Sequence, residues 1–221
     1  MGGNHTVKQG EHISSIAYQY GFADWKSIWN RPENADLKQQ RQNPNVLFPG
    51  DQVFIPDKTV KEISKPVDNQ HAFKVPVTTL LLRLKLDRSY SNPIVNTPCD
   101  LLVGTTATKL TSDGGGAIEQ KIPKTATDAR LIVHDKFTVK GNSVPIDLDI
   151  PISIGHLDPV EEVSGQVARL ANLGYYREDP NAFDQDEFSS SVEEFQCEQG
   201  LTVDGICGPQ TQAKLKSVHG C

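Results

Sequence analysis

The sequence predicts a multidomain α+β protein: a βααβ module, then an antiparallel β-sandwich, then a module of three helices. Apolar residues recur with helical spacing near both ends of the chain, whereas the stretch between them alternates with period two and has no helical stripe. The length of 221 residues is too great for one small module and fits two or three. We therefore place domains at 1–58, 73–154 and 155–221, with a polar linker at 59–72.

Composition and charge narrow the classes of partner. With 37% hydrophobic and 23% charged residues the chain is typical of a globular protein, and no apolar run is long enough to predict a membrane span. The net charge of −6 makes nucleic acid a poor partner. Residues 155–221 carry four basic and twelve acidic side chains, so the charge itself indicates a boundary near 155.

The N-terminal sequence and the cysteines indicate in which cellular compartment the protein works. The chain does not open with a basic segment followed by an apolar one, so we expect no Sec signal peptide. We therefore expect the protein either to stay in the cytoplasm or to be delivered to the periplasm or outside by a secretion machine other than Sec. The four cysteines fit no zinc motif, and we predict no metal and no cofactor. Reduced thiols are the default, but a local Cys197–Cys207 bridge is plausible in an oxidising compartment.

Two strands and two helices are expected within residues 1–58. The strands cover 5–7 and 53–55, and Pro56 ends the second. Between them lies one apolar stripe with helical spacing, formed by Ile13, Ile16, Ala17 and Tyr20. Asp24 can cap a second helix, which would bury Trp25, Ile28 and Trp29.

These residues resemble the LysM family over about fifty positions. The matching pieces are Val7, Gly10, Ile13, Ser14–Ala17, Tyr20-Gly21, Asn30, Val46–Gly50 and Val53–Pro56. The resemblance implies a module that binds glycans containing N-acetylglucosamine, chiefly peptidoglycan or a chitin-like polymer.

In that family the sugar lies in a shallow groove between two loops, so the resemblance assigns glycan binding to Gly10, Glu11, His12, Ile13, Val46, Leu47, Phe48 and Pro49. We expect His12 and Phe48 to face the groove, and this groove to carry more of the affinity than the acidic third module. Two features depart from the family, namely Glu11-His12 after the first glycine and a polar insertion at 31–45. They leave open a second interpretation, a LysM-like scaffold that docks a protein instead of a glycan.

In the middle segment apolar and polar residues alternate, as they do in half-buried strands. Leu80, Leu82, Leu84 and Leu86 share one face, and so do Val144, Ile146, Leu148, Ile150, Ile152 and Ile154. Pro145 and Pro151 cannot donate ladder hydrogen bonds, so the second run is expected at an edge. Six or seven short strands predict a small antiparallel β-sandwich, such as the immunoglobulin type. The stretch 111–123 resembles prealbumin-like and carboxypeptidase-regulatory-like sandwiches, which implies a spacer or docking surface.

The last segment predicts three helices. The first is expected to start at Asp158, with Pro159 next and Glu161 completing a capping box. Gly200 should close the second helix, and Gly208-Pro209 should open the third.

This segment resembles the three-helix peptidoglycan-binding domain. The matching residues are Val167, Leu170, Leu173–Tyr175, Val192, Phe195-Gln196, Gly200–Gly205, Gly208-Pro209 and Thr211. The resemblance implies a second wall-binding loop formed by Leu201, Asp204, Gly205 and Ile206. The first loop, Asn181–Asp184, departs from the family pattern.

The order of the modules is similar to that of small proteins associated with bacterial type VI secretion clusters. The resemblance implies a bacterial protein that works with a contractile injection apparatus, with secretion-spike or effector proteins as further partners.

No catalytic motif is apparent, and we predict that the protein is not an enzyme and has no catalytic residue. The tail Ser217–Cys221 resembles the Ser-His-Gly-Cys signature of L,D-transpeptidases, but a helix end capped by Gly220 is the simpler interpretation. We therefore expect a non-enzymatic peptidoglycan-binding protein, with a protein–protein adaptor as the alternative.

Overall fold

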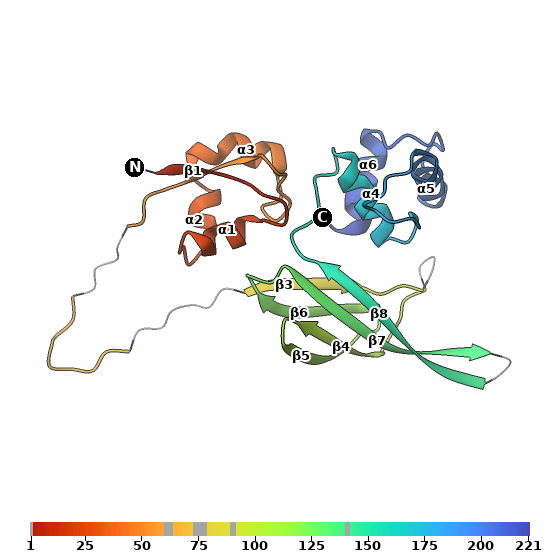
Figure 1. Ribbon diagram of the computed structural model, residues 1–221, viewed down its shortest axis with the longest axis horizontal. Coiled ribbons are helices and arrows are strands. Elements are labelled where there is room, and N and C mark those ends of the chain that lie inside the picture. The colour runs from red at the N-terminus through yellow and green to blue at the C-terminus, as the bar shows by residue number, and fades with distance from the viewer. Residues whose placement is uncertain (1, 60–63, 73–78, 89–91, 140–141) are drawn as a thin grey trace.

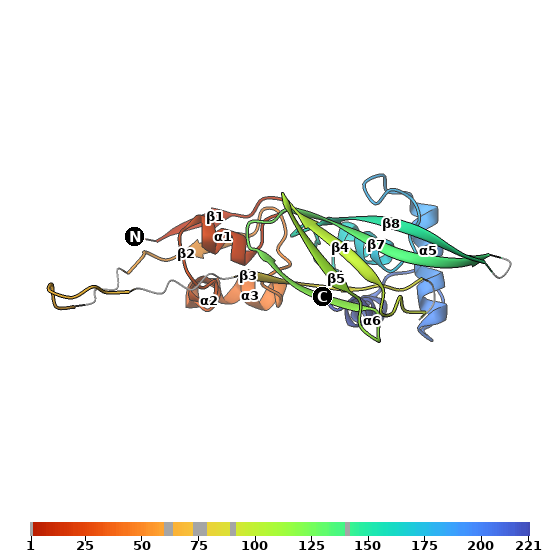
Figure 2. The ribbon, with the colours of Figure 1, turned by 90° about the horizontal axis from the view of Figure 1, so that it is seen from below.

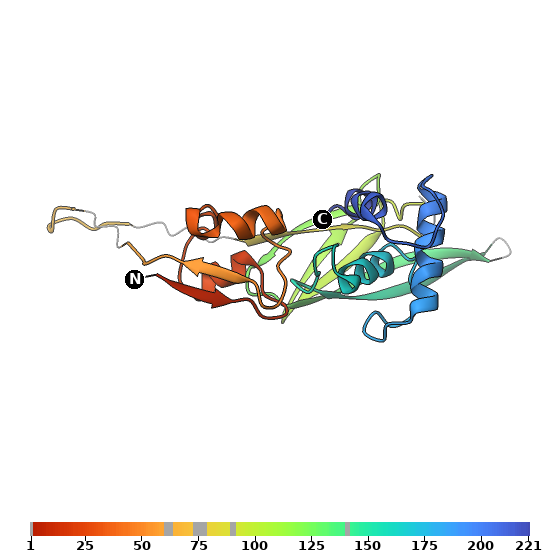
Figure 3. The same cartoon turned by 90° about the horizontal axis from the view of Figure 1, so that it is seen from above.

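The computed structural model describes residues 2–59, 64–72, 79–88, 92–139 and 142–221. These residues form a mixed α+β chain with six α-helices and antiparallel sheets. Two helical modules, one from each end of the chain, lie over the sheets of the middle segment (Figure 1). Seen from above, they lie next to each other along the long axis (Figure 3). Residues 60–63 of the predicted linker and the predicted first residues of the second domain, 73–78, lie outside the described part.

The first module closes with a two-stranded antiparallel sheet. Strand β1 (Gly3–Thr6) pairs with β2 (Gln52–Ile55), so the two ends of the module meet. Helices α1 (Ile13–Gln19) and α2 (Lys26–Trp29) lie between them and supply most of the buried cluster. Its members include Val7, Ile13, Ile16, Ala17, Ile28, Trp29 and Val53. The predicted apolar stripe is therefore the core of this module.

The polar insertion contains a helix that its sequence pattern does not reveal. A 3-10 turn (Pro32–Asn34) leads into α3 (Ala35–Arg41), in which Leu37 is the buried residue. With one buried apolar position no period can be recognised, which is why the helix was not predicted. Asn34 anchors the turn, because its side chain donates to the carbonyls of Ile28 and Phe54 and accepts from the Phe54 amide, at 2.9, 2.9 and 2.7 Å.

Two antiparallel sheets form the middle module. One pairs β3 (Thr79–Lys85) with β6 (Ala117–Pro123). The other has the order β5-β4-β7-β8, and its strands span Thr106–Thr111, Pro98–Val103, Asp128–Val139 and Asn142–Ser153. Both sheets contribute to one hydrophobic cluster, with Ile118 and Ile122 from the first and Leu101 and Leu131 from the second.

Strand β8 lies at an edge, as its prolines predicted. The expected burial of its whole apolar face is wrong, because Val144 and Ile146 are exposed while Leu148, Ile150 and Ile152 pack against the core. The reason is geometric: β4 pairs with β7 only through Arg130–Val133, so the distal half of the β7–β8 hairpin extends past the other strands (Figures 1 and 2).

The third module packs α4 (Val163–Asn172), α5 (Gln185–Glu198) and α6 (Pro209–His219) around Val167, Leu170, Phe195 and Leu215. The glycine at 200 follows α5 and Pro209 opens α6, which confirms both predicted boundaries. None of the helices in the described ranges has the length and apolar character that crossing a membrane needs.

The predicted start of the first helix in this module is wrong. Helix α4 begins at Val163, and Asp158 accepts a hydrogen bond from the Ser164 hydroxyl at 2.6 Å instead of capping. Residues 158–160 run back over the helix at Gly165, where an added Cβ would lie 2.0 Å from the Pro159 carbonyl oxygen. Gln166 holds this loop by donating to the Val160 carbonyl at 2.9 Å. These tertiary contacts outweigh the local capping signal.

Candidate peptidoglycan-binding site

A cleft of about 560 Å³ opens in the third module between α5 and the loop before α6. Asp204, Gly205 and Ile206 line it from the loop, and Phe188, Ser189 and Glu193 line it from α5. Three of the four residues predicted for the second wall-binding loop therefore share one concave surface. The fourth, Leu201, packs against the hydrophobic cluster of the module and supports the loop from behind.

Gln196 holds this loop in place from the buried side of α5. Its side-chain oxygen accepts from the amides of Asp204 and Gly205 at 2.9 and 3.1 Å. Its side-chain nitrogen donates to the Asp204 carboxylate, the Ile206 carbonyl and the Thr211 hydroxyl at 2.8, 3.0 and 3.0 Å. With 1% of its surface exposed, Gln196 is a positioning residue that fixes the loop without reaching the cleft. Its place in the matching Phe195-Gln196 pair was the signal, but its role needed the structure.

Asp204 is committed to its own loop. Its carboxylate accepts from the Ile206 amide at 2.9 Å, and this bond, followed by the one from Gln196, lowers the pKa of Asp204. The carboxylate thus stays ionised while it shapes the turn at Gly205, whose φ is +68°. The side chain of Ile206 is left 65% exposed at the mouth of the cleft.

The two loops predicted for the first module lie side by side. The Ile13 amide donates to the Pro44 carbonyl at 3.1 Å, which ties the start of α1 to the second loop. In that loop Val46 and Leu47 are buried, and the Phe48 amide donates to Asp51 at 2.9 Å. The guanidinium of Arg41 donates two hydrogen bonds of 2.8 Å to the same carboxylate. Asp51 and Arg41 therefore hold the second loop in place.

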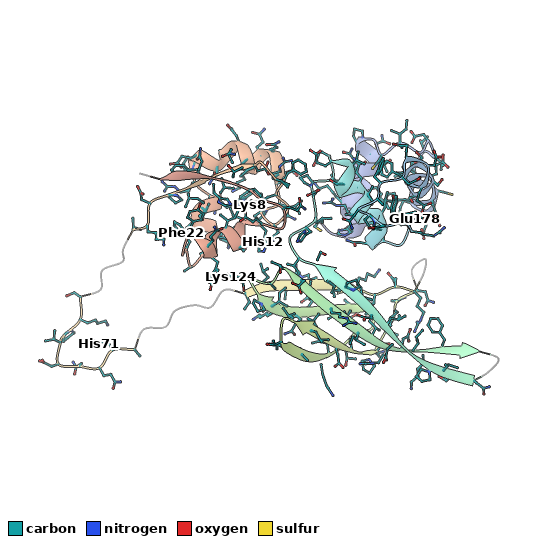
Figure 4. All side chains as sticks on the ribbon, in the orientation of Figure 1. Lys8, His12, Phe22, His71, Lys124 and Glu178 are labelled. Atoms are coloured by element: carbon teal, nitrogen blue, oxygen red, sulfur yellow. The ribbon has the colours of Figure 1, made fainter. Side chains whose placement is uncertain are left out.

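The prediction that His12 faces a groove is wrong. Its side chain is 3% exposed, and its Nδ1 accepts from the Ser15 amide at 3.3 Å as the N-cap of α1. Burial lowers the pKa of this imidazole, which keeps it neutral as an acceptor requires. Glu11 is also engaged within the module, with His5 Nε2 at 2.8 Å and the Lys8 amide at 2.9 Å. In Figure 4, His12 lies on the side of the first module that faces the third.

The segment that joins the second and third modules covers this loop. An added Cβ on Gly155 would lie 2.5 Å from the Gly10 carbonyl oxygen and 3.1 Å from the His12 ring. One on Gly10 would lie 2.9 Å from Nε2 of His156. Gln9 donates to Asp158 at 3.4 Å. Backbone of the joining segment therefore occupies the face where the sequence placed the glycan.

The chain end brings a thiol and an imidazole together. His219 Nδ1 lies 3.2 Å from the sulfur of Cys221, and the Asn172 amide nitrogen lies 3.1 Å from His219 Nε2. Burial lowers the pKa of His219 to about 4 and raises that of the Cys221 thiol. The pair is therefore neutral at pH 7, with little thiolate for nucleophilic attack.

All four cysteines are free thiols, so the Cys197–Cys207 bridge is not formed. Cys197 is exposed on α5, whereas Cys207 packs partly into the core, and burial raises its pKa to about 11. In the described part of the chain no three His, Cys, Asp or Glu side chains are grouped so that they could hold a metal ion.

Comparison with known proteins bears on the third module. Residues 161–215 match the model of a family described as "Putative peptidoglycan binding domain". The match spans all of the α4–α5 core, the Gln196-anchored loop and the cleft beside it. No curated protein and no solved structure matches the chain. The C-terminal helical region is thus a peptidoglycan-binding-like domain.

Proposed function

We propose that the protein binds peptidoglycan without cleaving it, and that the cleft beside the 201–206 loop is the principal contact. The proposal depends on one observation, that the family match and a cleft fall in the same part of the structure. The segment that matches the peptidoglycan-binding family contains a preformed cleft, and its rim is the loop that Gln196 holds with four hydrogen bonds.

The cleft has the chemistry that an amino-sugar polymer with peptide branches requires. Ile206 and Phe188 offer apolar surface to methyl groups, while Ser189 and Gln185 offer hydroxyl and amide groups for hydrogen bonds. A loop that is already ordered loses little entropy on binding. Glu193 adds one carboxylate to the lining, which suits a ligand with amide or amine donors.

The test is retention on purified sacculi. Replacing Ile206→Asp puts a charge at the mouth of the cleft and should weaken binding about tenfold, the equivalent of about 1.4 kcal/mol. Val203→Asp is the matched control, because Val203 is 52% exposed on the same loop but does not line the cleft. Equal retention of the two variants and the parent protein would place the wall contact elsewhere.

The same sacculi test the absence of enzymatic activity. We expect no soluble muropeptides from the parent protein. Release above a heat-inactivated control, lost in a Cys221→Ser variant, would instead make the Cys221–His219 pair a catalytic site.

We assign the first module a secondary role as an N-acetylglucosamine-binding LysM-like unit. Support comes from the sequence resemblance and from the adjacency of its two loops at Ile13 and Pro44. With residues 155–158 over Gly10, the third module carries more of the affinity in this arrangement, the reverse of the expectation from sequence.

The wider setting that we propose is a bacterial type VI or related contractile injection system, on the strength of the module order. The alternative is an adaptor that docks a secretion spike or effector, and the covered face of the first module favours it. A pull-down from lysate beside the pull-down on sacculi separates the two, since an adaptor captures a spike protein and is not retained by sacculi.

A further inference from the structure

We propose a second ligand site, between the first and third modules, that takes a short peptide with free carboxylates. A cleft of about 630 Å³ lies there, within the size range of small-molecule sites. Gln42, Asn43 and Val46 form its wall on the first module, and Arg169, Lys216 and Ser217 form its wall on the third. Residues far apart in the sequence thus line one cavity.

Arg169 places a positive charge at the base of the cleft. Its side chain is 1% exposed, and its guanidinium donates to a main-chain oxygen of Cys221 and to the carbonyls of Asp158 and Gly165, at 2.8, 2.8 and 2.7 Å. Within the described ranges no Asp or Glu side chain forms an ion pair with it. Burial lowers the pKa of Arg169, and the nearby acidic groups of Cys221, Glu161 and Asp158 offset that effect only in part. Its buried charge is therefore incompletely balanced, which is costly. An anion in the cleft relieves that cost.

Lys216 adds a second positive charge. It is half-buried on α6, and its ammonium group makes no hydrogen bond or ion pair with any residue that the structure describes. Arg41, on the opposite wall, differs because its charge is matched by Asp51 in a pair that is 8% exposed on each side. The charges available to a ligand are therefore those of Lys216 and Arg169, both from the third module.

The remaining lining suggests a peptide and not a simple anion. Gln42 and Asn43 carry amides that can pair with peptide groups, and Val46 and Val160 give apolar surface. Glu161 also lines the cleft and suits a ligand amine. A neutral glycan would bring no negative charge to Lys216 and Arg169, whereas the peptide stem of peptidoglycan has carboxylates and an amine. This last step rests on the proposed function.

The experiment is calorimetry on the full chain with the tripeptide L-Ala-γ-D-Glu-L-Lys. Lys216→Gln should raise Kd about tenfold, the effect of losing one charge-assisted hydrogen bond. Lys214→Gln is the control, because Lys214 lies on the same helix and does not line the cleft. Ser217→Trp should fill the cleft and abolish binding. Gln42→Glu should weaken binding, because it places a negative charge from the first module close to the carboxylates of the tripeptide.

The proposal is overturned if the parent protein does not bind the tripeptide at about millimolar concentration, or if Lys216→Gln and Lys214→Gln behave alike. An unchanged Kd in Gln42→Glu with a changed one in Lys216→Gln would overturn the two-module site. Sacculi retention that depends on Ile206 is a separate readout. If that readout fails while the tripeptide binds, the proposed function is wrong and the cleft takes acidic peptides of another origin.

Discussion

Single polar side chains with several partners organise this protein at the scale of the residue. Gln196 fixes a loop, Asn34 fixes a turn, and His134 joins three strands. His134 Nδ1 lies 2.7 Å from Asp147 on β8 and Nε2 lies 3.2 Å from Asp100 on β4. The hydrogen bond to Asp147, then the one to Asp100, raises the pKa of His134 above its ordinary 6.5.

That shift predicts a pH dependence of stability. Because the folded pKa is raised, the contribution of His134 is fully present below pH 6.5 and is lost as pH rises through the folded value. In thermal melts from about pH 5 to pH 9, a His134→Gln variant should melt at a lower temperature than the parent protein, and this difference should shrink as pH rises. His71→Gln, outside the sheets, should show no such trend. A difference that grew with pH would contradict this role.

At the scale of the element, α3 depends on a polar anchor more than on its own apolar face. Leu37 is the buried residue of the helix, while Asn34 ties its start to α2 and to β2. Asn34→Ala leaves backbone groups at Ile28 and Phe54 without partners in a buried setting. We expect a loss of about 2–3 kcal/mol in the free energy of unfolding of this module.

Tryptophan fluorescence measures that loss directly, since both tryptophans of the chain, Trp25 and Trp29, lie in the first module. Asn45→Ala is the control, because the Asn45 side chain is exposed, and it should change stability by less than about 0.5 kcal/mol. Equal denaturation curves for the two variants would show that α3 is held by something else.

At the scale of the whole molecule, the first module is held by the junction before the third and by contact with the sheets. Gly155 and His156 pack on Gly10, and Lys124 lies 4.8 Å from the ring centre of Tyr18. The described linker residues 64–72 lie away from the three modules (Figure 1), so they do not set this position.

Gly155→Ala should therefore separate the modules. Its Cβ would meet the Gly10 carbonyl at 2.5 Å, a backbone contact that cannot be relieved by a rotamer change. Small-angle scattering should show a larger radius of gyration. Gly104→Ala is the matched control, since Gly104 also has a positive φ but an added Cβ there meets nothing within 4 Å. Superimposable scattering of both variants would show that the contact does not hold the modules together.

Strong local signals in the sequence were enough to predict several elements. The stripe from Ile13 to Ala17, the alternation from Leu80 to Leu84, and the glycine and proline at 200 and 209 each led to the element observed. These signals are local, because burial repeats with the period of the backbone and because glycine and proline restrict their own φ angles. The loop at 204–206 was expected on other grounds, namely the resemblance of this segment to the peptidoglycan-binding domain.

What those elements face could not be predicted, because it follows from contacts between distant parts of the chain. The capping signal at Asp158 yielded to contacts with Gly165 and Gln166, and His12 became a buried cap instead of a groove residue. The cleft between the modules joins Gln42 to Lys216, which no local pattern relates. Such features depend on how the modules pack, and packing is set by shape and charge across the interface, which leave no period in the sequence.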